Sequence, residues 1–283
     1  MTSPARGAAA PSTSRRRVVV VRNGDTQITD DQLAGEEPLQ IRAAGPGQRP
    51  QDVAVTLRTP GHEPELAVGF LHAEGLLAPG EVATVEQGQL LRDARPDDTV
   101  TVHLTRPLDL EAVAARRSAA TAACGVCGKA SIDDVRVRCS PLPPGPRRPI
   151  SELLELPGRL RHAQEVFDET GGLHAAATAR HDGQLELVRE DVGRHNALDA
   201  VVGAHLLADR LPLHDRVLVL SGRIGFELVQ KAALAGLGVV VAVGAASDLA
   251  VRTAEALGVT LVGFVRDDRA NVYTHEDRLD LGR

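Results

Sequence analysis

The second half of the chain carries the pattern that most constrains its fold. From about residue 150 onward, short and continuous apolar runs alternate with segments of helical spacing. The clearest apolar runs are 216-RVLVL-220, 238-GVVVAV-243 and 259-VTLVGFV-265. Continuous apolar strands between helices are typical of a sheet whose two faces are both covered by helices. The pattern therefore predicts an α/β domain over residues 150–283.

The same half of the chain predicts where a ligand would bind. Further helices are expected at 151–169, 194–209, 225–236 and 247–257, and further strands at 174–180 and 184–189, joined by a turn at Asp182-Gly183. In sheets of this class, ligands bind beyond the carboxyl ends of the strands. The loops expected at those ends are Ser221–Arg223, Gly244–Ser247 and Arg266–Arg269.

The first half of the chain has a different character, and the two halves are separated. Strands are expected at 18–21, 52–59 and 99–105, with one clear helix at 63–77. The segment 141-PLPPGPRRP-149 cannot continue a helix or a central strand. We therefore expect a disordered tail over 1–16, a β-rich domain over 17–110, a cysteine-bearing loop and Pro-rich linker over 111–149, and the α/β domain over 150–283.

Composition and charge exclude several classes of protein. The chain has 283 residues and a formal net charge of −6, which is not the balance of a non-specific nucleic-acid binder. With four Phe, one Tyr and no Trp, it offers little for stacking single-stranded bases. No apolar run approaches the ~20 residues that a membrane-spanning helix needs. Four valines follow Arg15–Arg17, too few for the ~7–15 apolar residues of an export signal, so we expect a cytoplasmic protein.

The sharpest local motif is 124-CGVCGKASID-133. The thiols of Cys124 and Cys127 are separated by two residues, and Lys129 adds a nearby cation that favours the nucleophilic thiolate. Three chemistries fit this spacing: thiol–disulfide exchange, a zinc site that includes Cys139 and a histidine, and sulfur carriage as a persulfide. Because no second close pair of ligands is present, zinc is disfavoured, while spacing alone does not separate the other two. Cys139 has no partner at a useful spacing and is interpreted as structural.

A charged segment follows the last apolar run. Arg266 and Arg269 have the guanidinium groups that suit phosphate binding, while Asp267 and Asp268 could accept hydrogen bonds from a guanine edge or balance charge. A solvated charged turn is the alternative. Three further residues lie in these motifs. Arg223 could contact an anion at a helix N-terminus, His174 is interpreted as a structural histidine and Lys231 as a surface lysine. Lys231 and Lys129 are the only two lysines among 32 basic residues.

Several motifs together resemble one family, the formate dehydrogenase accessory sulfurtransferases, or FdhD family. The matching segments lie in order over about residues 36–275 and are 36-EEPLQIR-42, 58-RTPGHEPELAVGFLHAEGLL-77, 124-CGVCGKASID-133, 171-GGLHAAA-177, 189-REDVGRHNALDAVVG-203, 221-SGRIGFELVQKAA-233 and 263-GFVRDDRANVYTH-275.

The resemblance implies a function and a fold. Sulfur would pass from a cysteine desulfurase, through Cys124 and Cys127, to the molybdenum of bis(molybdopterin guanine dinucleotide), which formate dehydrogenase requires. The resemblance also implies a homodimer, a C-terminal domain similar to cytidine deaminases without their metal site, and therefore no permanent metal. The segment implied to contact the cofactor consists of Phe264, Val265, Arg266, Asp267, Asp268 and Arg269. The rivals are a dithiol oxidoreductase and a cofactor-binding chaperone without sulfur chemistry.

Overall fold

The computed structural model describes residues 12–88, 98–120 and 140–282. Its main sheet has six strands in the order β13-β12-β11-β10-β8-β9. The strands β10, β11 and β12 run parallel to one another, whereas β8 is antiparallel to β10, and the pairs β8–β9 and β12–β13 are antiparallel. Their bounds are β8 His174–Ala179, β9 Leu185–Asp191, β10 Val217–Leu220, β11 Val239–Ala242, β12 Thr260–Arg266 and β13 Arg269–Thr274.

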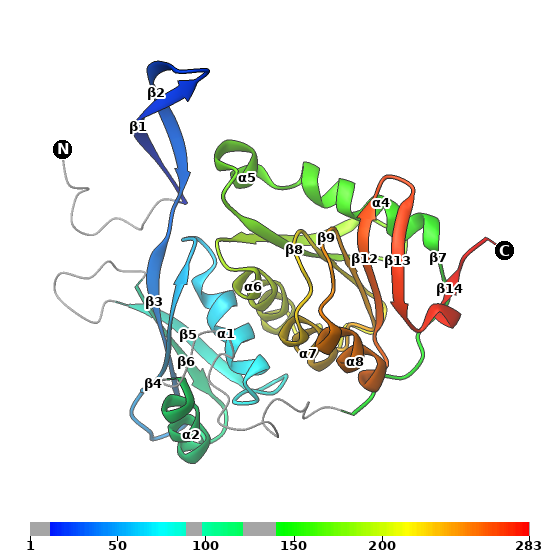
Figure 1. Ribbon diagram of the computed structural model, residues 1–283. Coiled ribbons are helices and arrows are strands. Elements are labelled where there is room, and N and C mark those ends of the chain that lie inside the picture. The colour runs from blue at the N-terminus through cyan, green and yellow to red at the C-terminus, as the bar shows by residue number, and fades with distance from the viewer. Residues whose placement is uncertain (1–11, 89–97, 121–139, 283) are drawn as a thin grey trace.

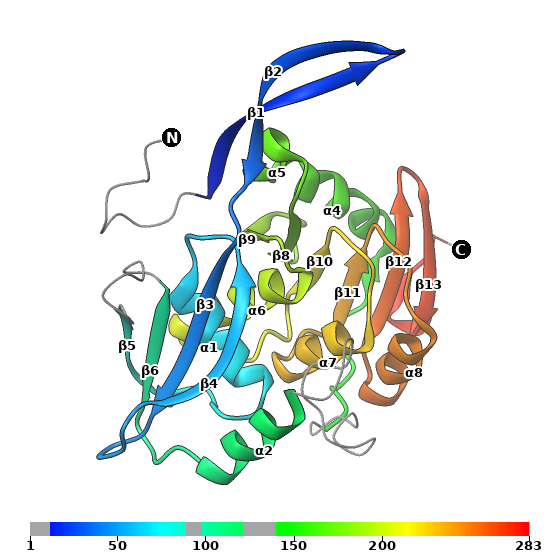
Figure 2. The same cartoon turned by 60° about the vertical axis from the view of Figure 1, so that its left-hand side comes forward.

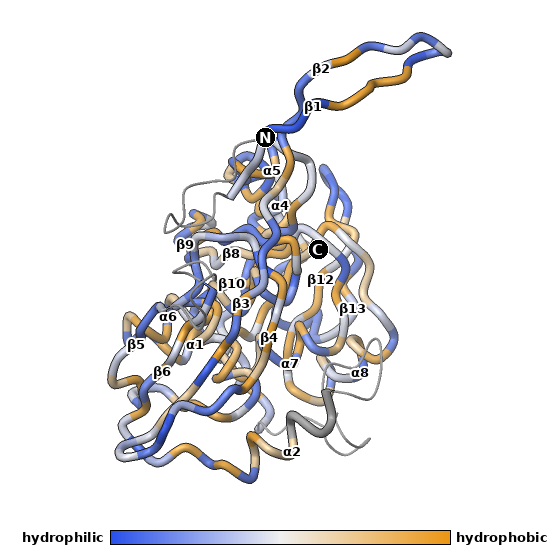
Figure 3. The backbone as a smooth tube through the Cα atoms, turned by 90° about the vertical axis from the view of Figure 1, so that its left-hand side faces the viewer, coloured by the Kyte–Doolittle hydropathy of each residue, from blue (hydrophilic) through white to orange (hydrophobic). Residues whose placement is uncertain are grey.

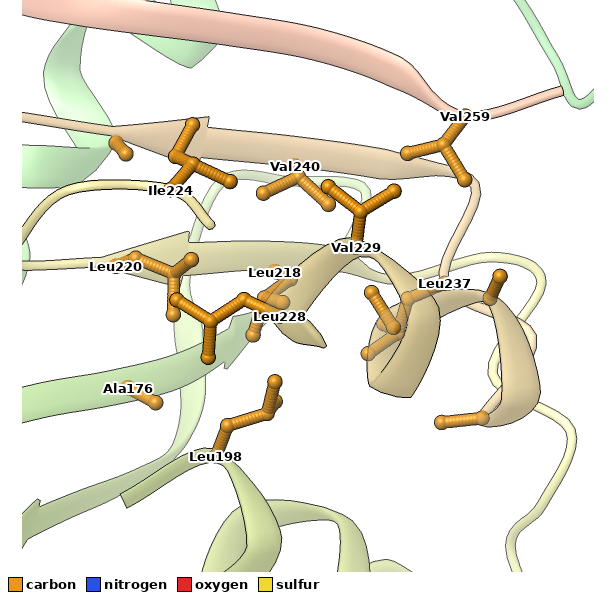
Figure 4. Close-up of a cluster of buried hydrophobic side chains, with 14 of the residues drawn as sticks. Ala176, Leu198, Leu218, Leu220, Ile224, Leu228, Val229, Leu237, Val240 and Val259 are labelled. Atoms are coloured by element: carbon orange, nitrogen blue, oxygen red, sulfur yellow. The ribbon is translucent and has the colours of Figure 1, made fainter. Parts of the chain in front are cut away.

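Helices cover both faces of this sheet, as the continuous apolar runs predict (Figure 1). On one face lies α4 (Ile150–His162), and on the other lie α6 (Arg194–Leu207), α7 (Phe226–Leu234) and α8 (Asp248–Leu257). Strand β10 shows why both faces must be apolar: Val217 and Val219 pack under α4, while Leu218 and Leu220 pack toward α7. Figure 4 shows the second of these cores, in which Leu228 and Val229 of α7 contact the strands.

The structure differs from the predicted elements of this half in two places. The helix expected over 151–169 is broken after His162, and a separate short helix, α5, runs from Glu165 to Thr170. The carboxylate of Glu190 accepts the amide hydrogens of Val166 and Phe167 at the start of α5, which gives this helix its own beginning. The strand β13 was not predicted, and it turns the charged segment after β12 into a hairpin.

The N-terminal part forms a second sheet with the order β4-β3-β6-β5 (Figure 2). The sequence motifs did not predict β3 (Glu37–Ala44) or β5 (Val82–Gly88), whereas β4 (Gln51–Arg58), β6 (Thr99–Leu104) and α1 (Glu63–Ala73) were expected. Inward-facing Leu39 and Ile41 of β3 pack with Leu71 of α1 in one apolar cluster. A further helix, α2 (Leu110–Ala120), lies in the region expected to be a loop.

The two sheets are joined through a close contact between α1 and α6. Ala200 and Leu206 of α6 belong to the apolar cluster of the N-terminal sheet. A Cβ atom on Gly69 would lie 1.8 Å from the carbonyl oxygen of Asp199, and one on Gly203 would lie 1.8 Å from that of Glu65. Each helix therefore presents a glycine where the backbone of the other passes, and no larger residue fits there.

The first elements form a hairpin that projects from the body of the molecule (Figure 3). The strand β1 (Thr13–Arg22) pairs with β2 (Asp25–Ala34) along its whole length, across a turn at Asn23-Gly24. The expectation of a disordered tail is therefore wrong for residues 13–16, because their backbone groups pair with the end of β2. Residues 1–11 lie outside the described part. Two further two-residue strands, β7 (Arg148–Pro149) and β14 (Leu279–Asp280), pair at the end of the Pro-rich segment.

Candidate functional site

The predicted loops meet at one edge of the main sheet. The loop after β10 and the loop after β11 are bonded to each other, because the amide of Ile224 donates to the carbonyl of Ala245 at 2.8 Å and that of Ser247 donates to Ile224 at 3.0 Å. A Cβ atom on Gly244 would lie 2.6 Å from the carbonyl oxygen of Gly222, so this approach requires glycine. The carboxyl ends of the parallel strands are thus gathered as expected.

A cavity of about 950 Å³ opens between this edge and the end of α4. Ser221 and Val243, at the ends of β10 and β11, form part of its wall, and α4 and α5 form another part. Its basic or imidazole side chains are Arg159, Arg161, His162, His174 and Arg266. Glu155 and Asp267 also line it, and Arg159 and Arg161 are paired with Glu155 and Asp168, so Arg266 is the lining arginine without an ion pair among the described residues. A cavity of this size can hold a ligand of nucleotide size.

The six residues of the predicted cofactor segment divide into three groups. Arg266 and Asp267 line the cavity. Val265 also borders it, although its side chain is 2% exposed and packs in the core beneath α4. Phe264 is 44% exposed and holds a left-handed φ of 52°, and its amide donates to the carbonyl of Gly244. Asp268 is at the tip of the β12–β13 hairpin, and Arg269 pairs with Arg266 across it.

The cysteine motif lies outside the described residues. This applies to Cys124, Cys127, Lys129 and Cys139. Among the residues that are described, no group of three or more His, Cys, Asp and Glu side chains is placed to hold a metal ion.

Sequence reasoning missed two polar contacts between α6 and α7. Nε2 of His195 lies 3.2 Å from Oε2 of Glu227, and Nζ of Lys231 lies 2.6 Å from both carboxylate oxygens of Asp199. The interpretation of Lys231 as a surface lysine is wrong, because its side chain is only 13% exposed and its partner Asp199 is 2% exposed. The signal was present in the sequence, since His195 and Asp199 are four apart, as are Glu227 and Lys231.

The surroundings of His195 keep its imidazole neutral. Burial lowers the pKa of His195 to about 4, and the nearby cations Lys231 and Arg194 act in the same direction. A neutral imidazole that donates its Nε2 hydrogen to Glu227 retains a lone pair on Nδ1. His195 therefore keeps a hydrogen-bond acceptor near the cations Lys231 and Arg194.

A second buried acid, Asp191, ties the N-terminal sheet to the start of α6. Its Oδ2 accepts the amide hydrogen of Thr59 at 3.0 Å, and its Oδ1 accepts those of Gly193 at 2.7 Å and of the Asn196 side chain at 3.0 Å. Burial nevertheless raises the pKa of Asp191 to about 6. The carboxyl group is therefore easier to protonate in the folded protein than in the unfolded chain.

This raised pKa predicts how the stability of the protein depends on pH. Between about pH 4 and 6 the folded state binds more protons at Asp191 than the unfolded state does, so the stability that this group contributes falls as the pH rises. The Asp191→Asn variant lacks that dependence. Relative to the variant, the wild type should lose roughly 2–3 kcal/mol of unfolding free energy from pH 4 to pH 7.

Urea unfolding of both proteins at several pH values measures this difference. His195 also titrates in this range, but it is present in both proteins, so its contribution largely cancels. A difference between the two proteins that stays constant from pH 4 to pH 7 would contradict the raised pKa.

The fold and this edge define a mixed α/β protein with a cavity at the carboxyl end of its main sheet, lined by both arginines and carboxylates. The sequence profile of the FdhD/NarQ family matches residues 34–280. The chain belongs to this family, as the motifs predicted. None of the described helices combines the length and apolar character needed to cross a membrane.

Individual relatives match over nearly the whole chain. The sulfur carrier protein FdhD of Mycolicibacterium paratuberculosis is 46% identical over 277 residues, which cover 94% of this chain and 98% of that protein. The protein of the same name from Streptomyces avermitilis is 44% identical over 280 residues, covering 95% and 96%. A crystal structure described as that of a formate dehydrogenase accessory protein from Desulfotalea psychrophila has the same fold, with a TM-score of 0.71 at 22% identity, and covers 95% of this chain and 100% of that one.

Proposed function

We propose that this protein is a sulfurtransferase for the maturation of formate dehydrogenase. It takes sulfur from a cysteine desulfurase, holds it as a persulfide and delivers it to the molybdenum of bis(molybdopterin guanine dinucleotide). The observation that carries the proposal is the match, over nearly the full length, to proteins named as sulfur carriers, in a chain that has the C-x-x-C pair. Its site of action is the cytoplasm, where the desulfurase and the unfinished dehydrogenase are available.

The two cysteines divide the sulfur chemistry between them. Cys124 holds the sulfane sulfur as a persulfide, and Cys127 attacks the inner sulfur of that persulfide. The products are a Cys124–Cys127 disulfide and hydrogen sulfide, so the two thiols supply the two electrons that reduce the sulfane sulfur. A thiol reductant then restores the dithiol. This sequence uses both cysteines and balances without a redox metal.

The cavity at the sheet edge is the proposed binding site for the guanine nucleotide ends of the cofactor. These ends are polyanionic, and the protein has a net charge of −6, so attraction must come from local cations. Arg266 lines the cavity and forms no ion pair with another described residue, which leaves its guanidinium available for a phosphate. Phe264 is exposed beside it and can pack against a ring.

Removing the hairpin arginines should weaken nucleotide binding. A charged contact to phosphate contributes about 1.5–3 kcal/mol, so Arg266→Ala should weaken the binding of GDP by roughly 10- to 150-fold. Arg269→Ala should have a smaller effect, because only Arg266 borders the cavity. Titration calorimetry with GDP measures both.

Arg180→Ala is the matched control, because Arg180 is exposed and lies at the other end of β8. Equal GDP affinity in the wild type and in the Arg266→Ala, Arg269→Ala double variant would show that this segment does not bind the nucleotide. Persulfide loading should be unchanged in all these variants, since that step needs only the thiols.

Three finer features belong to the same proposal. The protein acts as a homodimer, its main sheet is related to that of cytidine deaminases, and its cofactor is a substrate rather than a permanent group. The helices on both faces of the main sheet support the second of these. The alternatives, a dithiol oxidoreductase and a chaperone that binds the cofactor, do not predict a persulfide, so detection of that species separates the proposal from both.

A further inference from the structure

The β1–β2 hairpin stands away from the body of the molecule (Figure 3). Its strands pair with each other along their whole length and with no other described strand. The root of the hairpin is held beside the end of α5, because a Cβ atom on Gly172 would lie 3.6 Å from that of Ala34, the last residue of β2. A ribbon of two strands is at best marginally stable in water unless a third strand or a packed face supports it. The free length of this hairpin would therefore be stabilised by burial against another chain.

One face of the hairpin is apolar and exposed. Val19 lies opposite Ile28, and Val21 lies opposite Thr26. Residues opposite each other in an antiparallel pair point to the same face, as do residues two apart on one strand. Val19, Val21 and Ile28 are 61%, 65% and 58% exposed, whereas Val20, on the opposite face, is 36% exposed. A group of adjoining exposed aliphatic side chains is typical of a surface that contacts another molecule.

The charges of the hairpin are divided between its two strands. The strand β1 contains four arginines and no acid, whereas β2 contains three aspartates and no base. On the apolar face, Arg17 lies opposite Asp30, two residues from the pair of Val19 and Ile28. A basic position and an acidic position, like two aliphatic positions, thus lie directly across from each other on this face.

We propose that this apolar face is a contact between two copies of the chain, stacked face to face about a twofold axis parallel to the strands. The two tips then point the same way, and β1 of each copy lies over β2 of its partner. Each residue therefore lies over the partner's copy of the residue that it faces in its own hairpin. Arg17 meets the partner's Asp30, and Val19 meets the partner's Ile28, each contact being made twice.

Charge selects this arrangement over the other twofold arrangements of two hairpins. In those, β1 meets β1 of the partner or β2 meets β2, which places like charges opposite each other. The existence of a dimer is part of the proposed function, whereas the surface that forms it is assigned independently of the sulfur chemistry.

Sedimentation velocity of the full chain over a range of concentrations tests the apolar part of the contact. Val19→Asp should weaken the dimer by at least about 100-fold, because it buries a carboxylate in each half of the contact. Val20→Asp is the matched control, since it makes the same change on the opposite face and should leave the dimer intact. The three apolar cores contain no residue of β1 or β2, so both variants should stay folded. A monomeric wild type, or an equal dimer affinity in the wild type and Val19→Asp, would overturn the surface. Equal weakening by Val20→Asp would overturn the choice of face.

Mixing two charge variants tests the twofold arrangement. Arg17→Asp and Asp30→Arg should each weaken the dimer roughly tenfold, because each places like charges between the copies. In a mixed dimer, the new aspartate of one chain faces the new arginine of the other, and the remaining native aspartate faces the native arginine. The mixture should therefore dimerise about tenfold more tightly than either variant alone. A charge pair that acts only within one hairpin predicts no gain on mixing, and that result would overturn the stacking.

Persulfide loading, measured on the same proteins, separates this proposal from the proposed function. Val19→Asp retains its cysteines and should still gain sulfur. A monomeric wild type that gains sulfur would overturn the hairpin contact alone. A wild type that gains no sulfur, but whose dimer responds to the variants as expected, would overturn the sulfurtransferase alone.

Discussion

Replacing Gly203 with alanine should destabilise the protein by at least about 2 kcal/mol. The added Cβ would lie 1.8 Å from the carbonyl oxygen of Glu65, and backbone atoms of α1 cannot move aside as a flexible side chain could. The variant must separate α1 from α6, and this contact joins the two sheets. Urea unfolding monitored by circular dichroism measures the change.

Gly158→Ala is the control for the helix propensity of the substitution. Gly158 lies inside α4, and a Cβ atom there would meet no other atom within 4 Å. Because alanine is favoured over glycine in a helix, this variant should be as stable as the wild type or more stable by up to ~1 kcal/mol. If Gly203→Ala and Gly158→Ala unfold at the same urea concentration, the close approach of α1 and α6 is wrong.

The Cys124→Ala variant should lose the ability to activate formate dehydrogenase. Without the thiol there is no atom to hold the sulfane sulfur, so the loss should be complete rather than partial. Activation is measured by adding the purified variant to an extract that lacks the wild-type protein and assaying formate oxidation. The variant should still bind GDP, since the arginines that we assign to that step are intact.

Cys139→Ala is the control for the loss of a thiol as such. Cys139 has no partner at a useful spacing, so this variant should activate the dehydrogenase as the wild type does. Full activation by Cys124→Ala would contradict the proposal that Cys124 carries the persulfide. Loss of activation in both variants would show that the assay responds to any missing thiol.

Much of the main sheet was predictable because its strands are buried on both faces. The runs around β10, β11 and β12 are continuously apolar, and helices of clear spacing separate them, so the α/β class follows. The prediction of a turn at Asp182-Gly183 is also confirmed, since β8 and β9 pair on either side of it and Gly183 has a positive φ of 72°. Because the carboxyl ends of parallel strands share one edge, the binding loops could be named in advance.

Elements at the margins of the fold were harder to predict. The strand expected at 18–21 is the middle of β1, but the full length of β1 and all of β2 were not expected, because both strands are mostly exposed and are held by pairing with each other. The extra strand β13 is mostly of intermediate burial, and a turn at Asp267 with a φ of 50° leads from β12 into it. Strand pairing and turn conformation of this kind cannot be predicted from hydrophobic periodicity.

The sequence named residues for a candidate site but could not give their arrangement. Two arginines on one short segment indicated phosphate binding, yet the structure brings only Arg266 to the cavity. The contribution of α4 to the cavity could not be foreseen, because contact between α4 and the edge of the sheet is a property of packing. The pairing of Lys231 with Asp199 was missed because a single helix was considered at a time.

The most direct measurement of the central claim is mass spectrometry of the full-length protein after incubation with a cysteine desulfurase and cysteine. The account predicts one added sulfur atom on the peptide that contains Cys124 and Cys127, removed by a thiol reductant and absent in Cys124→Ala. Omitting the desulfurase should abolish the added mass. A wild-type protein that turns over with the desulfurase but gains no sulfur on this peptide would contradict the account.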